Sequence, residues 1–304
     1  MNETVLEVKN LKKNFGAFRA INDISFKISR GQVLGLLGPN GAGKTTTIHT
    51  LLGITLHNGG MISYFGKDFT KYREECLGRI NFASAFNMML GALTVFENLL
   101  VYAGLYGVKN PQNKIREFAD YFEVGNLLSK RFWDISSGQK TRVNFVKALL
   151  NDPEILLLDE PTASLDPDIA DKTLTLIERL KASRNLSILY TSHNMDEVTR
   201  LCDEVIFLDH GKIVAQDTPL GLTRRIKTAT LLICFSGDRG KIERFLRMQG
   251  KIFSFKSSFT VEIKTPEQDI PSLIFSMSKL GVEITDIEIK KPTLEDVFLQ
   301  IARE

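Results

Sequence analysis

The sequence is poor in cysteine, which excludes folds that depend on several disulfides or on a cysteine-bound zinc ion. It has 3 cysteines in 304 residues, namely Cys76, Cys202 and Cys234. Their odd number and wide separation exclude a disulfide framework and a zinc site built from paired cysteines. We therefore expect reduced thiols that pack as small hydrophobic side chains.

Long apolar runs and a strong net charge are also absent. No apolar run approaches the roughly 18 residues that a membrane-spanning helix requires. The first residues, Met1–Val5, lack the basic and apolar segments of a signal peptide. A formal net charge of +3 is small for this length, so nothing indicates nucleic acid as a partner. If the protein works at a membrane, another protein must hold it there.

Length and element order predict two domains, residues 1–218 and 219–304. At about 150 residues per domain, a chain of 304 residues has room for both. In the first part, short apolar runs at Val33–Leu37, Ile155–Leu158 and Leu186–Tyr190 alternate with helical patterns. This alternation predicts an α/β fold with a mostly parallel sheet, in which ligands bind beyond the carboxyl ends of the strands.

Further segments of the first part predict additions to this sheet. We expect an accessory antiparallel sheet near the N-terminus and a helical subdomain at about residues 86–150. The expected strands of the accessory sheet are Thr4–Val8, Ile21–Ile28 and Met61–Phe65, and the expected helices are Leu93–Gly107, Ile115–Phe122 and Gln139–Leu150.

After Pro219 the pattern changes to strand, helix, strand, strand, helix, strand. This order is ferredoxin-like and predicts a small α+β domain, followed by a short helix at Thr293–Ala302. The segment carries no catalytic motif that we can identify.

The most specific motif is a phosphate-binding loop between an apolar strand and a helix. The stretch Gly38–Thr45 fits the pattern G-x-x-x-x-G-K-[ST] without a gap. Its glycines let backbone N–H groups approach phosphate oxygens, and the helix N-terminus adds partial positive charge. Lys44 reaches the outer phosphates, and the Thr45 hydroxyl can bind Mg²⁺.

Two carboxylates follow the apolar strand Ile155–Leu158. Asp159 at the strand end can hold Mg²⁺ through water, and Glu160 can polarise an attacking water molecule. In isolation the pair could be a polar strand end, but the upstream phosphate loop favours a catalytic role.

The stretch Ser136-Ser137-Gly138-Gln139 stands immediately before a predicted helix. Either serine can cap that helix, and the free N–H groups of its first turn form a second anion site. A simple capping turn is the alternative interpretation.

Five motifs in this order resemble the ATP-binding subunit of ABC transporters. They are the phosphate loop, Ser136–Gln139, Ile155–Glu160, Ser164–Asp166 and Thr191–His193, and the resemblance covers about residues 4–218. It implies a P-loop NTPase fold and hydrolysis of ATP with Mg²⁺.

The resemblance also implies a role for each matching residue. The ATP-binding residues are the Walker A loop with its neighbour Thr46, namely Gly38, Pro39, Asn40, Gly41, Ala42, Gly43, Lys44, Thr45 and Thr46, and Phe15, which stacks on adenine and has Phe18 as its rival. The Walker B strand is Ile155 to Asp159, the catalytic glutamate is Glu160, and the switch histidine is His193. The signature that acts on the partner's nucleotide is Ser136, Ser137, Gly138 and Gln139, and the D-loop is Ser164, Leu165 and Asp166.

Two positions depart from the family pattern. The signature begins Ile135-Ser136-Ser137 where the family commonly has Leu-Ser-Gly, and Ala85 stands where a glutamine usually forms the Q-loop. Alanine cannot approach Mg²⁺ as that glutamine does, although neighbouring Ser84 offers a hydroxyl.

The resemblance finally implies partners and a location. We expect a head-to-tail pair of ATP-binding subunits, a separate membrane-spanning permease, and a cytoplasmic location at the inner face of the cell membrane. The tail Pro292–Leu299 resembles that of exporters of the daunorubicin type. The alternatives are a non-transport ABC ATPase and a degenerate subunit that binds ATP without turnover.

Overall fold

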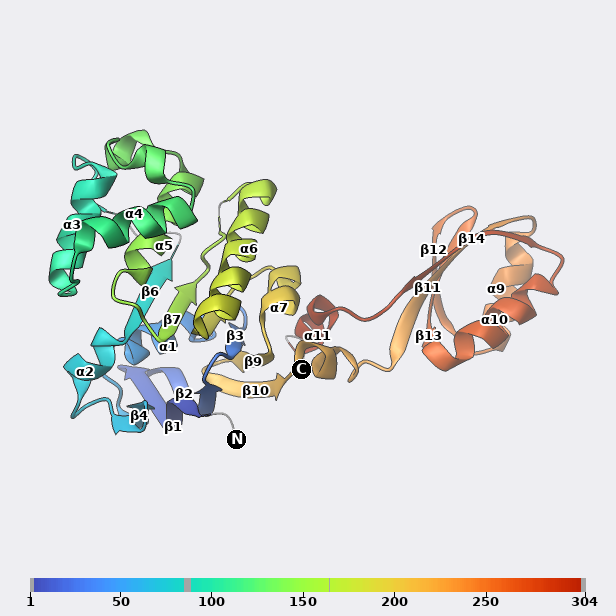
Figure 1. Cartoon of the computed structure of the whole chain (residues 1–304). Coiled ribbons are helices and arrows are strands. Elements are labelled where there is room, and N and C mark those ends of the chain that lie inside the picture. The colour runs from blue at the N-terminus through green and yellow to red at the C-terminus, as the bar shows by residue number, and fades with distance from the viewer. Residues whose placement is uncertain (1–2, 85–88, 164, 302–304) are drawn as a thin grey trace. The chain divides into compact units, whose positions relative to one another are not determined.

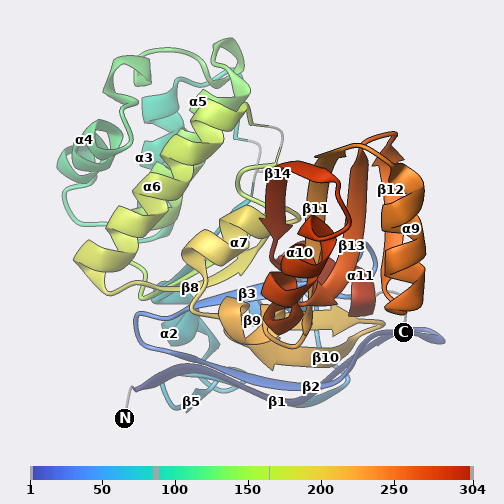
Figure 2. The ribbon, with the colours of Figure 1, turned by 90° about the vertical axis from the view of Figure 1, so that its right-hand side faces the viewer.

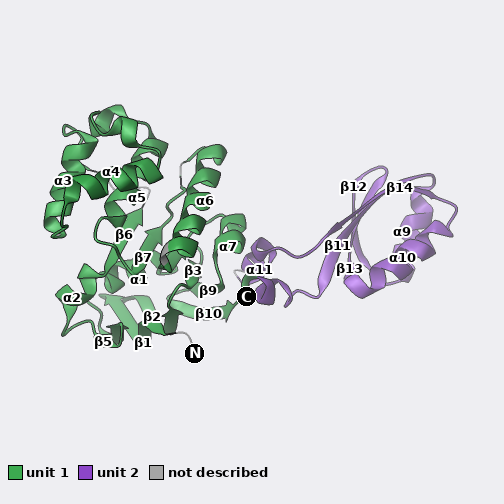
Figure 3. Cartoon of the chain, in the orientation of Figure 1, with its two compact units in different colours: residues 1–219 green, residues 220–304 purple. Residues whose placement is uncertain are grey.

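The computed structural model of the chain describes residues 3–84, 89–163 and 165–301 (Figure 1). These residues form two compact units, residues 1–219 and 220–304 (Figure 3). Among the described residues, no helix combines the length and hydrophobicity needed to cross a bilayer.

A six-stranded sheet forms the centre of the first unit. Five of its strands are parallel, and β10 pairs antiparallel with β9 at one edge. In spatial order the strands are β10 (Lys212–Asp217), β9 (Glu204–Asp209), β3 (Val33–Leu37), β8 (Ser187–Thr191), β7 (Ile155–Asp159) and β6 (Ile80–Ser84). All residues of β3 and β8 are buried, as expected for central parallel strands.

An antiparallel sheet lies against the central sheet. It contains β2 (Phe18–Ser29), β1 (Thr4–Phe15), β4 (Gly59–Tyr64) and β5 (Lys67–Asp68). Apolar residues of both sheets share one core with helix α1 (Lys44–Leu51). The strands β1 and β2 are longer than the sequence predicts, because their pairing continues through polar residues up to the pair Phe15–Phe18.

Some of the remaining helices of the first unit begin at recognisable start signals. Helix α3 (Val95–Leu105) begins with a capping box of Thr94 and Glu97, and α4 (Pro111–Tyr121) has proline at its first position. The others are α2 (Arg73–Gly78), α5 (Ser137–Leu149), α6 (Pro167–Arg184) and α7 (Met195–Leu201). Helices α6 and α7 pack against each other beside the central strands (Figure 2).

The second unit is a four-stranded antiparallel sheet with its own core. The strand order is β12 (Ile252–Ser257), β13 (Thr260–Pro266), β11 (Thr228–Ser236) and β14 (Glu283–Lys290). Apolar residues of α9 (Arg239–Met248) and α10 (Ile270–Ser278) join this core. The short helices α8 (Pro219–Thr223) and α11 (Leu294–Ile301) stand at the beginning and end of the segment.

Candidate active site

The phosphate loop joins β3 to α1, and three of its glycines have backbone conformations that other residues adopt only with strain. Gly38, Gly41 and Gly43 have φ angles of 146°, 83° and 107°. A Cβ atom on Gly43 would lie 2.4 Å from the carbonyl oxygen of Ala20, and one on Gly38 would lie 2.2 Å from that of Leu208. Neighbouring strands therefore fix the path of the loop at both ends.

The other residues of the loop are ordered by hydrogen bonds within it. The backbone N–H of Ala42 donates to the carbonyl of Pro39 at 3.1 Å, and Thr46 accepts a bond from Thr50 in the first turns of α1. Asn40 and Thr45 are exposed at the end of the loop. A ligand can thus reach these side chains from solvent.

The ammonium group of Lys44 is folded back over the loop. Its Nζ donates to the carbonyls of Gly38 at 2.6 Å and Pro39 at 3.1 Å. Burial lowers the pKa of Lys44, while the nearby charges of Glu160 and Asp159 act in the opposite direction. An ammonium group held by these two carbonyl oxygens can exchange them for phosphate oxygens when a nucleotide enters.

Two oxygen ligands for a cation converge between α1 and β7. The Thr45 hydroxyl donates to Asp159 Oδ2 at 3.4 Å, and the hydroxyl of Thr191 donates to Asp159 Oδ1 at 2.7 Å. No group of three or more His, Cys, Asp or Glu within the described ranges is arranged to hold a metal by itself. Thr45 and Asp159 fit Mg²⁺, which takes few protein oxygens and keeps water and phosphate ligands.

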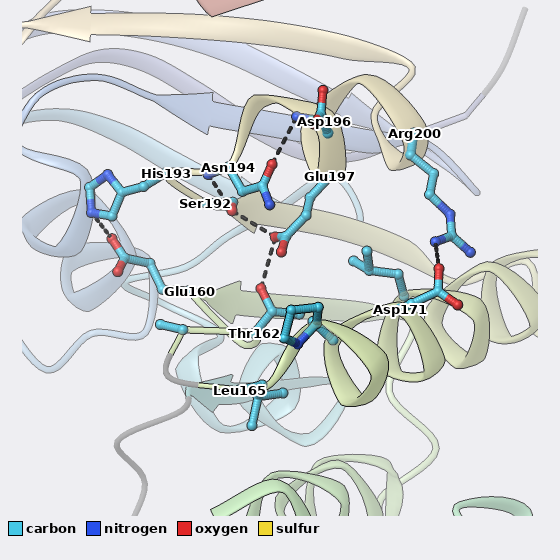
Figure 4. Close-up of a pocket in the computed structure, with 14 residues that line it drawn as sticks. Glu160, Thr162, Leu165, Asp171, Ser192, His193, Asn194, Asp196, Glu197 and Arg200 are labelled. Carbon is cyan, nitrogen blue, oxygen red and sulfur yellow. Dashed lines mark hydrogen bonds and ion pairs between the residues drawn. The ribbon is translucent and has the colours of Figure 1, made fainter.

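Glu160 and His193 are in direct contact. His193 Nε2 lies 2.6 Å from Glu160 Oε1, as Figure 4 shows. Glu160 has a positive φ of 50°, and its N–H donates to the carbonyl and the hydroxyl of Thr191. Thr191 therefore holds the carboxylate of Asp159 and the backbone of Glu160 at the end of β7, a role that the sequence interpretation missed.

Phe15 lies at the end of β1, where the hairpin turns toward β2. Its side chain is 51% exposed and that of Phe18 is 61% exposed, so neither is a core phenylalanine. The ammonium of Lys13 lies 4.7 Å from the centre of the Phe15 ring. An exposed ring of this kind can stack on a flat base.

The signature residues form the first turn of α5. Ser136 and Gln139 make a reciprocal capping box: the Ser136 hydroxyl accepts from the Gln139 N–H, and Gln139 Oε1 accepts from the Ser136 N–H. Ser136 and Ser137 are exposed. Gly138 is buried, and a Cβ there would lie 2.8 Å from Ile169 of α6.

The capping interpretation of this stretch is therefore correct as far as it goes. Within the described residues, the side chains of Ser136 and Gln139 hydrogen-bond to each other's backbone N–H groups and not to the phosphate loop.

The D-loop and Q-loop positions are only partly described. Leu165 donates to the carbonyl of Thr162 at 3.1 Å, and Asp166 stands at the N-cap of α6. Ser84 ends β6 beside Asp159 in parallel register. Ser164 and Ala85 lie outside the described residues.

A buried lysine connects the signature helix to the strand that leads to Ser84. Lys147 of α5 donates from Nζ to the carbonyl of Phe82 at 3.2 Å, and burial lowers its pKa to about 8. The contact links the helical part of the unit with the edge of the central sheet.

Comparison with known proteins identifies the family. Residues 21–163 match the family described as ABC transporter. The chain is 32% identical over 309 residues to a Nod factor export ATP-binding protein I of Rhizobium sp. (strain N33), with 99% of this chain and 98% of the relative covered. It is 28% identical over 305 residues to the linearmycin resistance ATP-binding protein LnrL of Bacillus subtilis (strain 168), with 98% of each covered.

A solved structure agrees with this. The ATP-binding subunit of an ABC transporter superposes with a TM-score of 0.67 at 29% identity, covering 73% of this chain and 92% of that one. The predicted P-loop NTPase fold and the predicted family are both confirmed. The chain belongs to the ABC transporter family and is one of its ATP-binding, ATP-hydrolysing subunits.

Proposed function

We propose that this chain energises an exporter, with residues 1–218 as the ATP-binding domain and residues 219–304 as an accessory, regulatory domain. One observation carries the proposal. Five side chains with the chemistry of ATP hydrolysis converge at the carboxyl ends of the central strands, namely Lys44, Thr45, Asp159, Glu160 and His193. The direction of transport is supported by the names of its relatives, which are a Nod factor export protein and a linearmycin resistance protein.

The proposed roles are those that the family resemblance implies, and the contacts of these residues are compatible with them. The glycines of the loop and Lys44 bind the phosphates of ATP, and Phe15 stacks on the adenine. Thr45 and Asp159 hold Mg²⁺, which neutralises phosphate charge when bound. Glu160 accepts the proton of the attacking water, and His193 holds that carboxylate and contacts the γ-phosphate.

The complete site requires two copies of the chain. The exposed cap of Ser136 and Ser137 lies at a helix N-terminus, where free N–H groups attract anions. Its own hydrogen bonds remain within its first turn. A head-to-tail homodimer would bring the Ser136–Gln139 turn of one copy to the γ-phosphate held by the other. Closure with ATP and reopening after hydrolysis then supply the mechanical step.

A membrane permease completes the transporter and holds the chain at the inner face of the cell membrane. We expect a tagged copy expressed in its source cell to co-purify from detergent-solubilised membranes with a protein of several membrane spans. The reason is that ATP-binding subunits of ABC transporters work with membrane permeases. Recovery of the chain without any membrane protein, at low salt and with ATP present, would contradict the proposal.

A further inference from the structure

A carboxylate outside the family motifs lies behind the Glu160–His193 pair. Glu197, in the first turn of α7, is only 6% exposed. Its Oε2 atom accepts hydrogen bonds from three hydroxyl groups at 2.7–2.8 Å: Thr162 at 2.8 Å, Tyr190 at 2.7 Å and Ser192 at 2.7 Å. All three donors are themselves buried, so none can exchange this bond freely for water.

Two of these donors belong to the loops that carry the catalytic pair. Thr162 follows Glu160 by two residues, in a tight turn where the N–H of Ala163 donates to the Glu160 carbonyl. Ser192 precedes His193, and its hydroxyl also accepts from the N–H of Asn194 at 3.0 Å. The Ser192 hydroxyl therefore spans the turn on which His193 stands.

The third donor anchors this arrangement to the sheet. Tyr190 lies in β8, with its ring fully buried. Figure 4 shows Glu197 between Thr162 on one side and Ser192 on the other, while the Glu160–His193 pair lies beyond them. Arg200 of the same helix is directed elsewhere, to Asp171 and Glu178.

We propose that Glu197 is a positioning residue that sets the distance between Glu160 and His193 by tying both of their loops to one buried oxygen atom. The catalytic part of this inference rests on the proposed roles of Glu160 and His193, whereas the geometric part does not. Small displacements of catalytic groups lower rates strongly, so loss of the shared acceptor should affect turnover more than ATP binding.

The choice of variants separates positioning from mere folding. Glu197→Gln retains an oxygen at the acceptor position, so the hydroxyls of both loops, Thr162 and Ser192, can still donate to it. Glu197→Ala removes the acceptor. We expect kcat to fall about 100-fold in Glu197→Ala, with KM for ATP within about 3-fold, and Glu197→Gln to stay within about 3-fold of the wild type.

Variants of the three hydroxyl donors keep the proposal testable if Glu197→Ala does not fold. Thr162→Val and Ser192→Ala each release one loop, while Tyr190→Phe removes a bond to the same oxygen and releases neither. We expect the first two to lower kcat at least about 5-fold more than Tyr190→Phe does. Thr199→Ala, an exposed change on the same helix, is the control for unchanged turnover. Equal losses of kcat in Thr162→Val, Ser192→Ala and Tyr190→Phe would overturn the proposal.

A direct readout of the geometry distinguishes this inference from the proposed function. NMR of the labelled histidine rings should show the His193 signal, assigned with His193→Gln among the 4 histidines, moving in Glu160→Ala. Glu197→Ala should move that signal in the same direction, and Glu197→Gln should leave it in place. An unmoved signal in Glu197→Ala refutes positioning, whatever the ATPase result. Unchanged turnover in Glu160→Gln refutes the catalytic assignment alone.

Discussion

Replacing Glu160 with glutamine should lower the rate of ATP hydrolysis by about 100-fold or more while ATP affinity stays within a few-fold. Glutamine has the same size and can keep a hydrogen bond to His193, which lies 2.6 Å from Glu160 Oε1. It cannot accept the proton of the attacking water. The groups that bind phosphate, above all Lys44, are untouched.

The measurement is phosphate release at saturating ATP, together with nucleotide binding by calorimetry. Glu74→Gln on the exposed surface of α2 is the matched control, because it makes the same chemical change away from the site. Turnover at the wild-type rate in Glu160→Gln would refute the assignment of this residue as the general base.

Gly43→Ala should destabilise the protein by about 3 kcal/mol and lower ATP affinity more than 10-fold. The residue has a φ of 107°, and a Cβ would lie 2.4 Å from the backbone oxygen of Ala20. Backbone atoms of β2, which is paired with β1, cannot move as a flexible side chain could. The loop must therefore distort at the position that precedes Lys44.

Gly41→Ala is the matched control for this change. Gly41 also has a positive φ, of 83°, but no heavy atom lies within 4 Å of a Cβ built there. We expect only the conformational cost of about 1 kcal/mol. Chemical denaturation of both variants, followed by nucleotide titration, makes the comparison. If the two variants lose equal stability, close packing of the loop against β2 is not what fixes its path.

The phosphate loop was predictable because local chemistry determines it. An apolar strand, glycines at fixed positions and a helix start are all encoded within Val33–Leu51, and the structure has β3, the loop and α1 there. Helices α3, α4 and α5 were also predicted by their apolar spacing, with boundaries that differ by a few residues because caps such as Thr94 and Ser136 decide the first turn. The short helix α2 was not predicted.

Strand β6 was missed because its pattern is short and mixed. Ile80–Ser84 contains Asn81 and Ser84 and becomes a strand by pairing with β7 at the edge of the sheet. That pairing is a tertiary contact that no local pattern encodes. The consequence matters for function, because β6 delivers Ser84 to a position beside Asp159.

Thr191 and Glu197 were missed for a related reason. The parallel register of β7 and β8 pairs Asp159 with Thr191, and Glu197 meets Thr162 only when α7 packs against the end of β7. The sequence contains one available signal, a glutamate four residues after His193 in the first turn of a predicted helix. Its burial with three hydroxyl partners could not be read from that spacing.

In the proposed dimer, the phosphate loop of one chain and the Ser136 cap of another share one ATP. This arrangement is tested most directly by light scattering of the Glu160→Gln protein with Mg²⁺ and ATP. We predict twice the chain mass of 34.2 kDa, and a return to a single chain when Ser136→Asp is added. Aspartate caps a helix as well as serine does, so the fold is kept, but its charge repels the γ-phosphate. A single-chain mass for Glu160→Gln with ATP, or a pair that survives Ser136→Asp, would contradict the composite site.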